Sequence, residues 1–235
     1  MNIFHCERIT KNYENIPVVE NINLELPTGG FISLLGPSGV GKTTLFNVLA
    51  GLDLPDAGKV LLAGEDITGI GGRVGYMPQK DLLLEHRTVL DNVILPLLIR
   101  GEKKKTAREN AAAFFPQFGL AGYEKKYPWQ LSGGMRQRAA LLRTCMTHND
   151  VILLDEPFSA LDAITRRHMQ DWYRDIAANL KLSTIFITHD VDEALLLSDT
   201  VHILNGKPGK ITHTMAVSSH RSEQKQAILE AIGLT

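Results

Sequence analysis

The chain of 235 residues has only two cysteines, Cys6 and Cys145, which lie far apart and form no CxxC pair. A disulfide framework is therefore not expected, and a reducing cytosol is the default compartment. The sequence also lacks a run of the roughly 20 apolar residues that a membrane span needs. Its strongest candidate, VILPLLI at 93–99, is short and contains Pro96. If the protein works at a membrane, another chain must supply the spans.

An excess of positive charge is missing as well. The formal net charge is −1 and the isoelectric point is about 6.7. This balance argues against a nucleic-acid binder that relies on a basic surface, although a local basic patch stays open. The sequence has no internal repeat, and the charged N-terminus does not resemble a signal peptide. A hydrophobic content of 44% at this length suits one large domain, or one domain with a substantial insertion.

Alternation of strand-like and helix-like segments dominates the chain. Strands are predicted at 3–10, 18–26, 31–36, 59–64, 73–79, 151–157 and 183–190, with 200–206 and 210–217 as a closing pair. Helices are predicted near 42–51, 163–179 and 191–197, and the block 88–147 is predicted to be an inserted helical lobe. Strand–helix–strand order implies a parallel α/β core.

The stretch GPSGVGKTT at 36–44 fits the pattern G-x-x-x-x-G-K-[ST]. Its glycines allow backbone amides to surround an anion, and the following helix points its positive end at the same place. Lys42 would reach the terminal phosphates of a nucleotide, and the Thr43 hydroxyl would ligate Mg²⁺. The alternative is a plain glycine turn. Because the loop stands between a buried strand and an amphipathic helix, nucleotide binding is favoured.

A second signal is VILLDEP at 151–157. A buried strand that ends in Asp155 would bring a carboxylate beside the loop, where Mg²⁺ needs an anionic partner. Glu156 would polarise the water that attacks the γ-phosphate. The alternative is a pair of solvated acids at a strand end, but the presence of Lys42 favours the catalytic interpretation.

The motif LSGGMRQR at 131–138 distinguishes the chain from kinases and GTPases, and no N-K-x-D guanine-reading motif is present. Ser132 can cap a helix, and Gly133 and Gly134 leave backbone amides bare, so this is a second anion site. One nucleotide does not need two such sites from one subunit. The pattern predicts that this site serves a nucleotide held by a partner copy. An ordinary Ser-capped helix would explain Ser132 but not the glycines.

Together these motifs resemble the ATP-binding subunit of an ABC transporter over residues 3–215. GPSGVGKTT is similar to the Walker A loop, YMPQ to the Q-loop, LSGGMRQR to the signature, VILLDEP to Walker B, SALD at 159–162 to the D-loop, and THD to the switch-histidine motif. The resemblance implies an α/β P-loop NTPase core, a mostly parallel sheet flanked by helices, with an N-terminal antiparallel β subdomain and the inserted helical lobe. It implies a single domain over 1–235, with a nucleotide-binding core at 1–87 and 148–215, the lobe at 88–147 and a short tail at 216–235.

ATP and Mg²⁺ are the implied ligands. The resemblance assigns catalysis to Glu156, His189, Gln79 and Lys42, and metal binding to Thr43, Gln79 and Asp155. The residues implied in nucleotide binding are Tyr13, Gly36, Pro37, Ser38, Gly39, Val40, Gly41, Lys42, Thr43, Thr44, Ser132, Gly133, Gly134 and Asp162.

Several of these assignments have plainer alternatives. Tyr13 would stack on adenine, or is an ordinary strand aromatic. Gln79 would touch Mg²⁺ or the attacking water, or merely ends a strand. His189 would donate to the γ-phosphate and orient Glu156, or is only a polar residue before a helix.

Helix starts and packing give further expectations. Asp190 and Glu193 are predicted to form a capping-box-like start for the helix after His189. Asp162 is expected to cap the next helix in either case. Trp129 and Cys145 are interpreted as packing residues, and the lysine run 103–105 as a solvated helix face.

The resemblance also implies partners: a second copy of the chain in an ATP sandwich, transmembrane permease subunits, an external solute-binding protein, and no nucleic acid. The expected location is the cytoplasmic face of the inner membrane. The segment 81–101 either forms a groove for a permease helix or packs within the lobe. GKPGKI at 206–211 and YPWQLSGG are similar to importers of nitrate, sulfonate, taurine or thiamine precursors, although LLRTCMTHND and EHRTVLDN depart from that group. The alternative is a soluble ABC-type ATPase acting on ribosomes or DNA.

Overall fold

The computed structural model describes residues 2–159 and 161–233. The strands are β1 (Asn2–Tyr13), β2 (Ile16–Pro27), β3 (Phe31–Leu35), β4 (Ala57–Leu62), β5 (Glu65–Asp66), β6 (Gly75–Met77), β7 (Val151–Asp155), β8 (Ser183–Thr188), β9 (Thr200–Asn205) and β10 (Lys210–Ala216). The helices are α1 (Lys42–Leu49), α2 (Val89–Val93), α3 (Leu95–Ile99), α4 (Lys104–Ala112), α5 (Gly133–Cys145), α6 (Ala163–Asn179), α7 (Val191–Leu197) and α8 (Arg221–Ile232), with a short 3₁₀ turn at Pro128–Gln130. No helix within these described ranges has the length and apolar character to cross a membrane.

The larger sheet has the strand order β10-β9-β3-β8-β7-β6. All its neighbouring pairs are parallel except β9 with β10, which confirms the predicted parallel core and closing pair. Every residue of β3, β7 and β8 is buried, as expected for continuous apolar strands covered on both faces. Parallel strands end at one edge of the sheet, so the segments that follow β3, β7 and β8 meet there.

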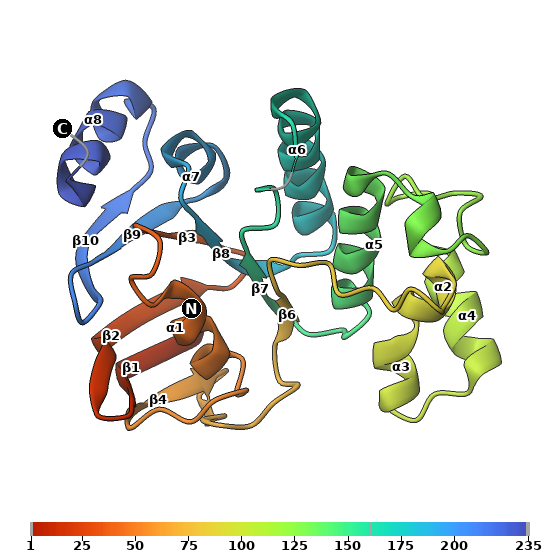
Figure 1. Cartoon of the computed structure of the whole chain (residues 1–235), viewed down its shortest axis with the longest axis horizontal. Helices are drawn as coiled ribbons and strands as arrows, with labels where there is room; N and C mark the ends of the chain where they lie inside the picture. Colours follow the sequence, from red (N-terminus) through yellow and green to blue (C-terminus); the bar gives the residue numbers. More distant parts are fainter. Residues whose placement is uncertain (1, 160, 234–235) are drawn as a thin grey trace.

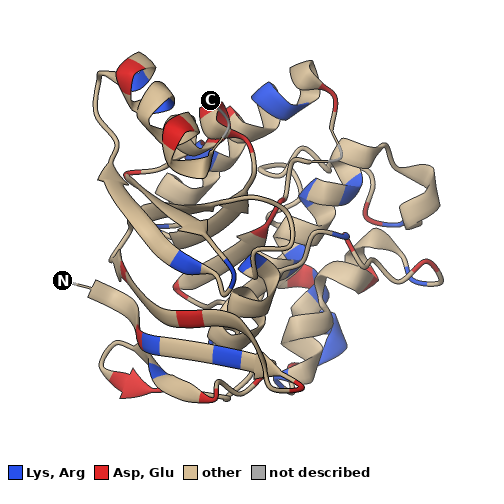
Figure 2. Ribbon diagram, turned by 60° about the vertical axis from the view of Figure 1, so that its left-hand side comes forward, with Lys and Arg blue, Asp and Glu red and all other residues tan. Residues whose placement is uncertain are grey.

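The smaller sheet is antiparallel and has the order β2-β1-β4-β5. β1 and β2 are each longer than predicted, because Glu14 and Asn15 turn the chain with φ of 51° and 66° and let the strands pair up to that turn. Helix α1 contacts both sheets and buries Leu45, Phe46 and Val48 in the core between them (Figure 1). Acidic and basic residues are interspersed over the ribbon, in keeping with the small net charge (Figure 2).

The helical lobe lies at one end of the molecule, with α2, α3 and α4 next to α5 (Figure 1). Its core contains Val89, Leu97, Phe115 and Phe118, all fully buried. The prediction of a helical block is confirmed, but the helices before α5 are short, and turns separate them.

The hairpin that β9 and β10 form lies directly behind the 36–44 loop. The Gly209 amide donates to the Val18 carbonyl at 2.9 Å, and the Gly209 carbonyl accepts from Glu20 at 3.0 Å, so the hairpin turn joins the two sheets. A Cβ atom at Gly209 would lie 2.2 Å from the Val40 carbonyl oxygen, which leaves room only for glycine. We call this turn with its Gly209 contacts the sheet staple.

Beyond β10, residues 217–233 are not an extended tail. They include helix α8, whose Ile228 is buried against Val191 and Leu195 of α7. On the surface, Lys225 of α8 forms a 2.7 Å ion pair with Asp192 of α7. The predicted tail thus covers the back of α7.

Candidate active site

The 36–44 loop connects β3 to α1 and surrounds the ammonium group of its own lysine. Lys42 Nζ donates to the carbonyls of Gly36 at 2.7 Å and Pro37 at 3.0 Å. The loop tip at Pro37, Ser38 and Gly39 is exposed, whereas Val40 and Lys42 are buried. Burial lowers the pKa of Lys42, and the nearby carboxylates of Glu156 and Asp155 counteract this shift.

Two glycines of this loop are required by the fold itself. Gly36 lies so close to β9 that a Cβ atom would be 2.2 Å from the Leu204 carbonyl oxygen. Gly41 has a φ of 104° and faces Val19 of β2. Gly41 gives α1 no side-chain cap, and the first turn of α1 contains no acidic residue. Its first amide groups therefore remain available for an anion.

Next to the loop, a hydroxyl and a carboxylate lie together. Thr43 Oγ1 donates to Asp155 Oδ2 at 3.0 Å, from the start of α1 to the end of β7. Burial raises the pKa of Asp155, the Thr43 hydrogen bond lowers it, and the charge of Glu156 raises it further. A hydroxyl oxygen and a buried carboxylate oxygen are ligands that Mg²⁺ prefers, so these two side chains fit a magnesium ion.

Glu156 lies one residue beyond β7 and connects three segments. Its backbone φ is 46°, an unfavourable value for a residue with a side chain, and its amide donates to the Ile187 carbonyl at 3.1 Å. Glu156 Oε2 accepts from Gln79 Nε2 at 3.2 Å and lies 3.3 Å from His189 Nδ1. The structure therefore brings together Gln79, Glu156 and His189, which follow β6, β7 and β8.

Tyr13, the last residue of β1, lies at the rim of this site. Its hydroxyl donates to Asp53 Oδ2 at 2.6 Å, and the side chain of Thr44 on α1 lies against it. Lys11 Nζ is 5.0 Å from the ring centroid and also forms a 2.8 Å ion pair with Asp53. Sequence reasoning missed Lys11 and Asp53, because no motif links positions 40 residues apart. The phenol ring is thus fixed in place, with a cation close to it.

The signature segment begins α5, in the lobe. Ser132 accepts a hydrogen bond from the Met135 amide at 3.3 Å, which confirms the predicted helix cap. A Cβ atom at Gly134 would lie 3.3 Å from Thr165 of α6, whereas one at Gly133 would meet nothing within 4 Å. Among the described residues, no hydrogen bond or ion pair joins Ser132, Gly133 or Gly134 to the 36–44 loop. Within the described residues of one chain, the two predicted anion sites are therefore not bonded to each other.

Asp162 and Asp190 both cap helices. Asp162 accepts from the amides of Ile164 at 3.2 Å and Thr165 at 3.0 Å, as predicted. Within the predicted SALD motif, Ala160 lies outside the described residues. Asp190 caps α7 by accepting from the Glu193 amide at 3.1 Å. The reciprocal half of the predicted capping box is wrong, because Glu193 binds Thr188 and Gln170 instead of the Asp190 amide.

The two residues interpreted as packing residues differ. Cys145 is buried, as predicted. Trp129 is not, since 67% of it is exposed, and its ring stacks on Tyr127 with centroids 6.2 Å apart. The pair lies just before Ser132 on the surface of the lobe. The apolar pattern of a lobe sequence does not distinguish a core tryptophan from a surface one.

Comparison with known proteins is consistent with this geometry. The ABC transporter family matches residues 19–159. The formylaminopyrimidine import ATP-binding protein ThiZ of Halalkalibacterium halodurans is 44% identical over 82% of this chain and 75% of its own length. The aliphatic sulfonates import ATP-binding protein SsuB of Bacillus cereus is 41% identical over 86% of this chain and 79% of its own length.

A solved structure is similar over most of the molecule. It is the dimeric post-hydrolysis state of the ATP-binding cassette MJ0796 bound to ADP and Pi, with 27% identity and a TM-score of 0.80 over 92% of this chain and 99% of that one. Fold, motif order and sequence similarity agree over the same part of the chain. This protein belongs to the ABC transporter family.

Proposed function

We propose that this chain is the ATP-hydrolysing subunit of a transporter that takes up a small solute. The observation that carries the proposal is the arrangement around Glu156. One of its carboxylate oxygens is held by Gln79 and His189, at the same sheet edge as the Lys42 loop. Its other oxygen, Oε1, has no partner among the described residues and is free to accept a proton from water.

The side chains around the loop have separate tasks in hydrolysis. Lys42 and the first amides of α1 bind the terminal phosphates and stabilise charge on them. Thr43 and Asp155 would hold Mg²⁺, with Gln79, which bonds to the neighbouring Glu156, as a further ligand, and the metal would neutralise phosphate charge. Glu156 orients the attacking water as a general base, and His189 donates to the γ-phosphate.

The adenine is expected at Tyr13. Its ring stands at the loop, 44% exposed and fixed through its hydroxyl, so it offers a stacking surface that loses little conformational freedom when a base binds. Pro37, Ser38, Gly39, Val40 and Thr44 complete the loop side of the nucleotide site, and Asp162 supports the signature side through the helix it caps.

Two copies of the chain complete the site. Gly133 has open space around it, and Ser132 and Gly134 flank it at the start of a helix. These amides would bind the γ-phosphate of ATP held by the other copy, so that ATP joins the two subunits. Loss of the γ-phosphate removes those contacts, and the dimer relaxes.

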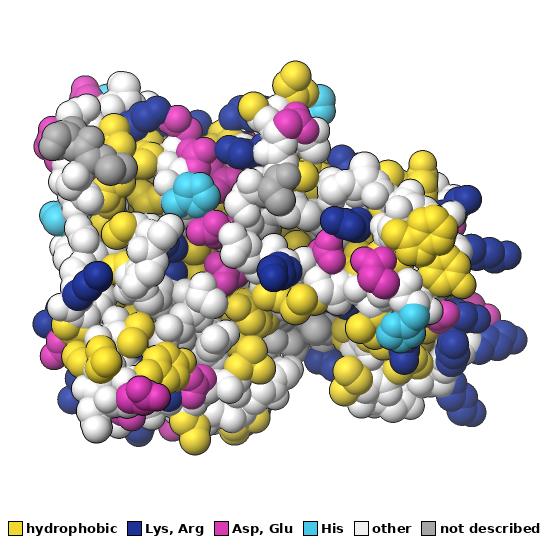
Figure 3. Space-filling model, in the orientation of Figure 1, with side chains coloured by type: hydrophobic (Ala, Val, Ile, Leu, Met, Phe, Trp, Pro, Cys, Tyr) yellow, Lys and Arg dark blue, Asp and Glu magenta, His cyan; other side chains and the backbone are white. Residues whose placement is uncertain are grey.

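The membrane partner is proposed to dock on the lobe. A cleft between the segment that follows Gln79 and the start of α5 is lined by Asp81, Leu82, Glu85 and Arg136. Leu82 and Ile99 are exposed large apolar residues of the 81–101 segment, and exposed hydrophobic side chains are seen at this end of the molecule (Figure 3). Such a surface suits a short amphipathic helix of a permease subunit.

From these contacts we further propose a peripheral location at the cytoplasmic face of the cell membrane and an external protein that delivers the solute. The names of the two relatives favour an aliphatic sulfonate or a formylaminopyrimidine as the solute, and the resemblance of the 206–211 segment adds nitrate, taurine or a thiamine precursor.

The test is ATP turnover and ATP-dependent dimerisation of the purified chain. Glu156→Gln should bind ATP, lower kcat by about 100-fold or more, and accumulate as a dimer in gel filtration with ATP. Glu109→Gln, which changes an exposed acid of α4, is the matched control and should behave like wild type. Wild-type protein that does not hydrolyse ATP, or Glu156→Gln protein that stays monomeric with bound ATP, would contradict the proposal. Co-purification with ribosomes or DNA instead of a multi-span membrane protein would contradict the transport role.

A further inference from the structure

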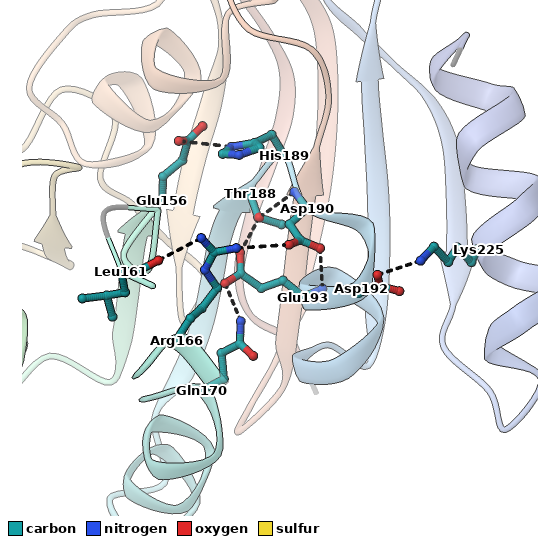
Figure 4. A network of polar contacts seen from close by, with 10 residues as sticks. All are labelled: Glu156, Leu161, Arg166, Gln170, Thr188, His189, Asp190, Asp192, Glu193 and Lys225. Atoms are coloured by element: carbon teal, nitrogen blue, oxygen red, sulfur yellow. Dashed lines mark hydrogen bonds and ion pairs between the residues drawn. The ribbon is translucent and has the colours of Figure 1, made fainter. Parts of the chain in front are cut away.

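Arg166, in the first turn of α6, connects the two segments that flank the candidate catalytic pair (Figure 4). Its Nη2 donates to the Leu161 carbonyl at 3.0 Å, and its Nη1 lies 3.6 Å from Asp190 Oδ2. Leu161 belongs to the segment that follows Glu156, and Asp190 directly follows His189. One guanidinium group therefore joins the chain on both sides of the Glu156–His189 contact.

A second connection from α6 reaches the same loop through buried groups. Gln170 Nε2 donates to Glu193 at 2.8 Å, and the other oxygen of Glu193 accepts from the Thr188 hydroxyl. Thr188 Oγ1 in turn accepts from the Asp190 amide at 3.0 Å. The backbone before and after His189 is thus fixed to α6 by hydrogen bonds (Figure 4).

The side chain of His189 makes few contacts of its own. Its side chain is 59% exposed, and the contact with Glu156 is the one polar side-chain contact that it makes among the described residues. A small cavity is lined by Glu156, His189, Arg166 and Asp190 together, so Arg166 lies close to the Glu156–His189 contact. The orientation of the imidazole depends on where the 188–190 backbone is held.

We propose that Arg166 is a positioning residue for hydrolysis. It connects the 189–190 loop to Leu161, which follows Glu156 in the chain, so that His189 faces Glu156. This inference rests on the proposed ATPase function. Because Arg166 bonds to both Leu161 and Asp190, a displacement of Leu161 would also move the loop that carries His189.

A purely structural role for Arg166 would be to stabilise α6. The neighbouring Arg167 gives a matched comparison, since it pairs only within the helix, with Asp171 at 3.3 Å. Both arginines lie in the first half of α6 and have a carboxylate partner, but only Arg166 bonds to segments outside this helix.

The first experiment compares Arg166→Ala with Arg167→Ala in steady-state ATPase assays. We expect Arg166→Ala to lower kcat about 10-fold with KM for ATP and the affinity for a fluorescent ATP analogue unchanged within about twofold, because misplacement of catalytic groups lowers the rate and not the binding. Arg167→Ala should stay within about twofold of wild type in all three quantities. Equal kcat for the two variants would overturn the proposal.

A second variant guards against loss of folding. Asp190→Asn keeps an oxygen that caps α7, since asparagine caps helices as well as aspartate, but it removes the charge that faces Arg166. It should also lower kcat, and the double variant Arg166→Ala/Asp190→Asn should be no slower than Arg166→Ala alone. Multiplicative losses in the double variant would contradict a shared action. The ATPase activity of the wild-type chain is measured first. Its absence would contradict the proposed function, and not the role of Arg166.

Discussion

Glycines of the 36–44 loop and glycines of the signature segment differ in the space that surrounds them. Gly36 and Gly41 face atoms of their own chain, at distances where a side chain cannot fit. A Cβ atom at Gly133 would meet nothing within 4 Å, and one at Gly134 would lie 3.3 Å from Thr165 and 4.0 Å from Leu161. The fold therefore requires glycine at 36 and 41, whereas no contact within the subunit requires one at 133. We infer that the 36–44 loop forms one half of the nucleotide site within its own subunit, and that the signature segment completes the site of a partner subunit.

Replacement of Gly133 should have the largest effect on function. Gly133→Val fits the isolated subunit but blocks the bare amides of α5, so ATP-dependent dimerisation should disappear and turnover fall about 100-fold. Gel filtration with ATP and an ATPase assay measure both. Ala121→Val adds bulk to an exposed position elsewhere in the lobe and should change neither. Normal ATP-dependent dimerisation of Gly133→Val would contradict the inference that the signature segment completes the site of a partner subunit.

Replacement of Gly36 should instead damage the subunit itself. Gly36→Ala forces a methyl group against the Leu204 carbonyl, and we expect a loss of about 1–3 kcal/mol in the free energy of unfolding, measured by urea denaturation of the monomer. Gly71→Ala is the matched control, because its Cβ would be at an ordinary 3.6 Å from the nearest atom. If Gly36→Ala unfolds like wild type, the fold does not require that glycine.

The buried carboxylate of Asp155, which bonds to Thr43 of the 36–44 loop, should destabilise the nucleotide-free protein when it is ionised. Burial raises the pKa of this carboxyl in the folded chain above its value in the unfolded chain. The free energy of unfolding is therefore highest below the unfolded-state pKa and falls as the pH rises through the folded-state pKa. Asp155→Asn should therefore raise the stability of the nucleotide-free protein at pH 8 by about 1 kcal/mol, or ~2–4 °C in Tm, while ATPase activity is lost.

The gain from Asp155→Asn should shrink as the pH is lowered from 8 to 4, because the wild-type carboxyl takes up a proton as the pH falls. Asp175→Asn, at an exposed position of α6, should leave Tm unchanged at both pH values. A melting temperature that is equal for Asp155→Asn and wild type at pH 8 would show that burial of this charge costs nothing.

The smallest effect is expected at Trp129. Because this side chain is mostly exposed, Trp129→Ala should change the free energy of unfolding by less than about 0.5 kcal/mol. Phe118→Ala, which removes a fully buried ring of the same lobe, should cost about 3–5 kcal/mol. Thermal unfolding of the two variants measures the difference, and a large loss for Trp129→Ala would mean that its stack on Tyr127 supports the lobe.

Sequence reasoning predicted the parts of the fold that local patterns determine. The buried strands β3, β7 and β8, the bounds of α6 and α7, and the caps at Ser132, Asp162 and Asp190 agree with expectation. Each depends on residues within a few positions of one another, where periodicity and capping chemistry suffice.

What sequence could not reveal are contacts between distant segments. The hold of Asp53 on Tyr13, the bonds of Arg166 to Leu161 and Asp190, and the exposure of Trp129 follow from how elements pack against each other. Arg166 and Arg167 look alike in sequence, yet only one reaches another element. The catalytic and binding roles of the motif residues remain predictions until the variants are measured.

The sheet staple has a consequence for the order in which the chain matures. Gly209 lies against Val40, and Leu204 against Gly36, so the phosphate loop rests on residues synthesised more than 160 positions later. During translation the loop leaves the ribosome early but lacks these contacts until the β9–β10 hairpin has been synthesised. A nascent chain that ends before residue 200 should therefore have the Lys42 motif without a formed nucleotide pocket, so that ATP capture has to wait for the β9–β10 hairpin.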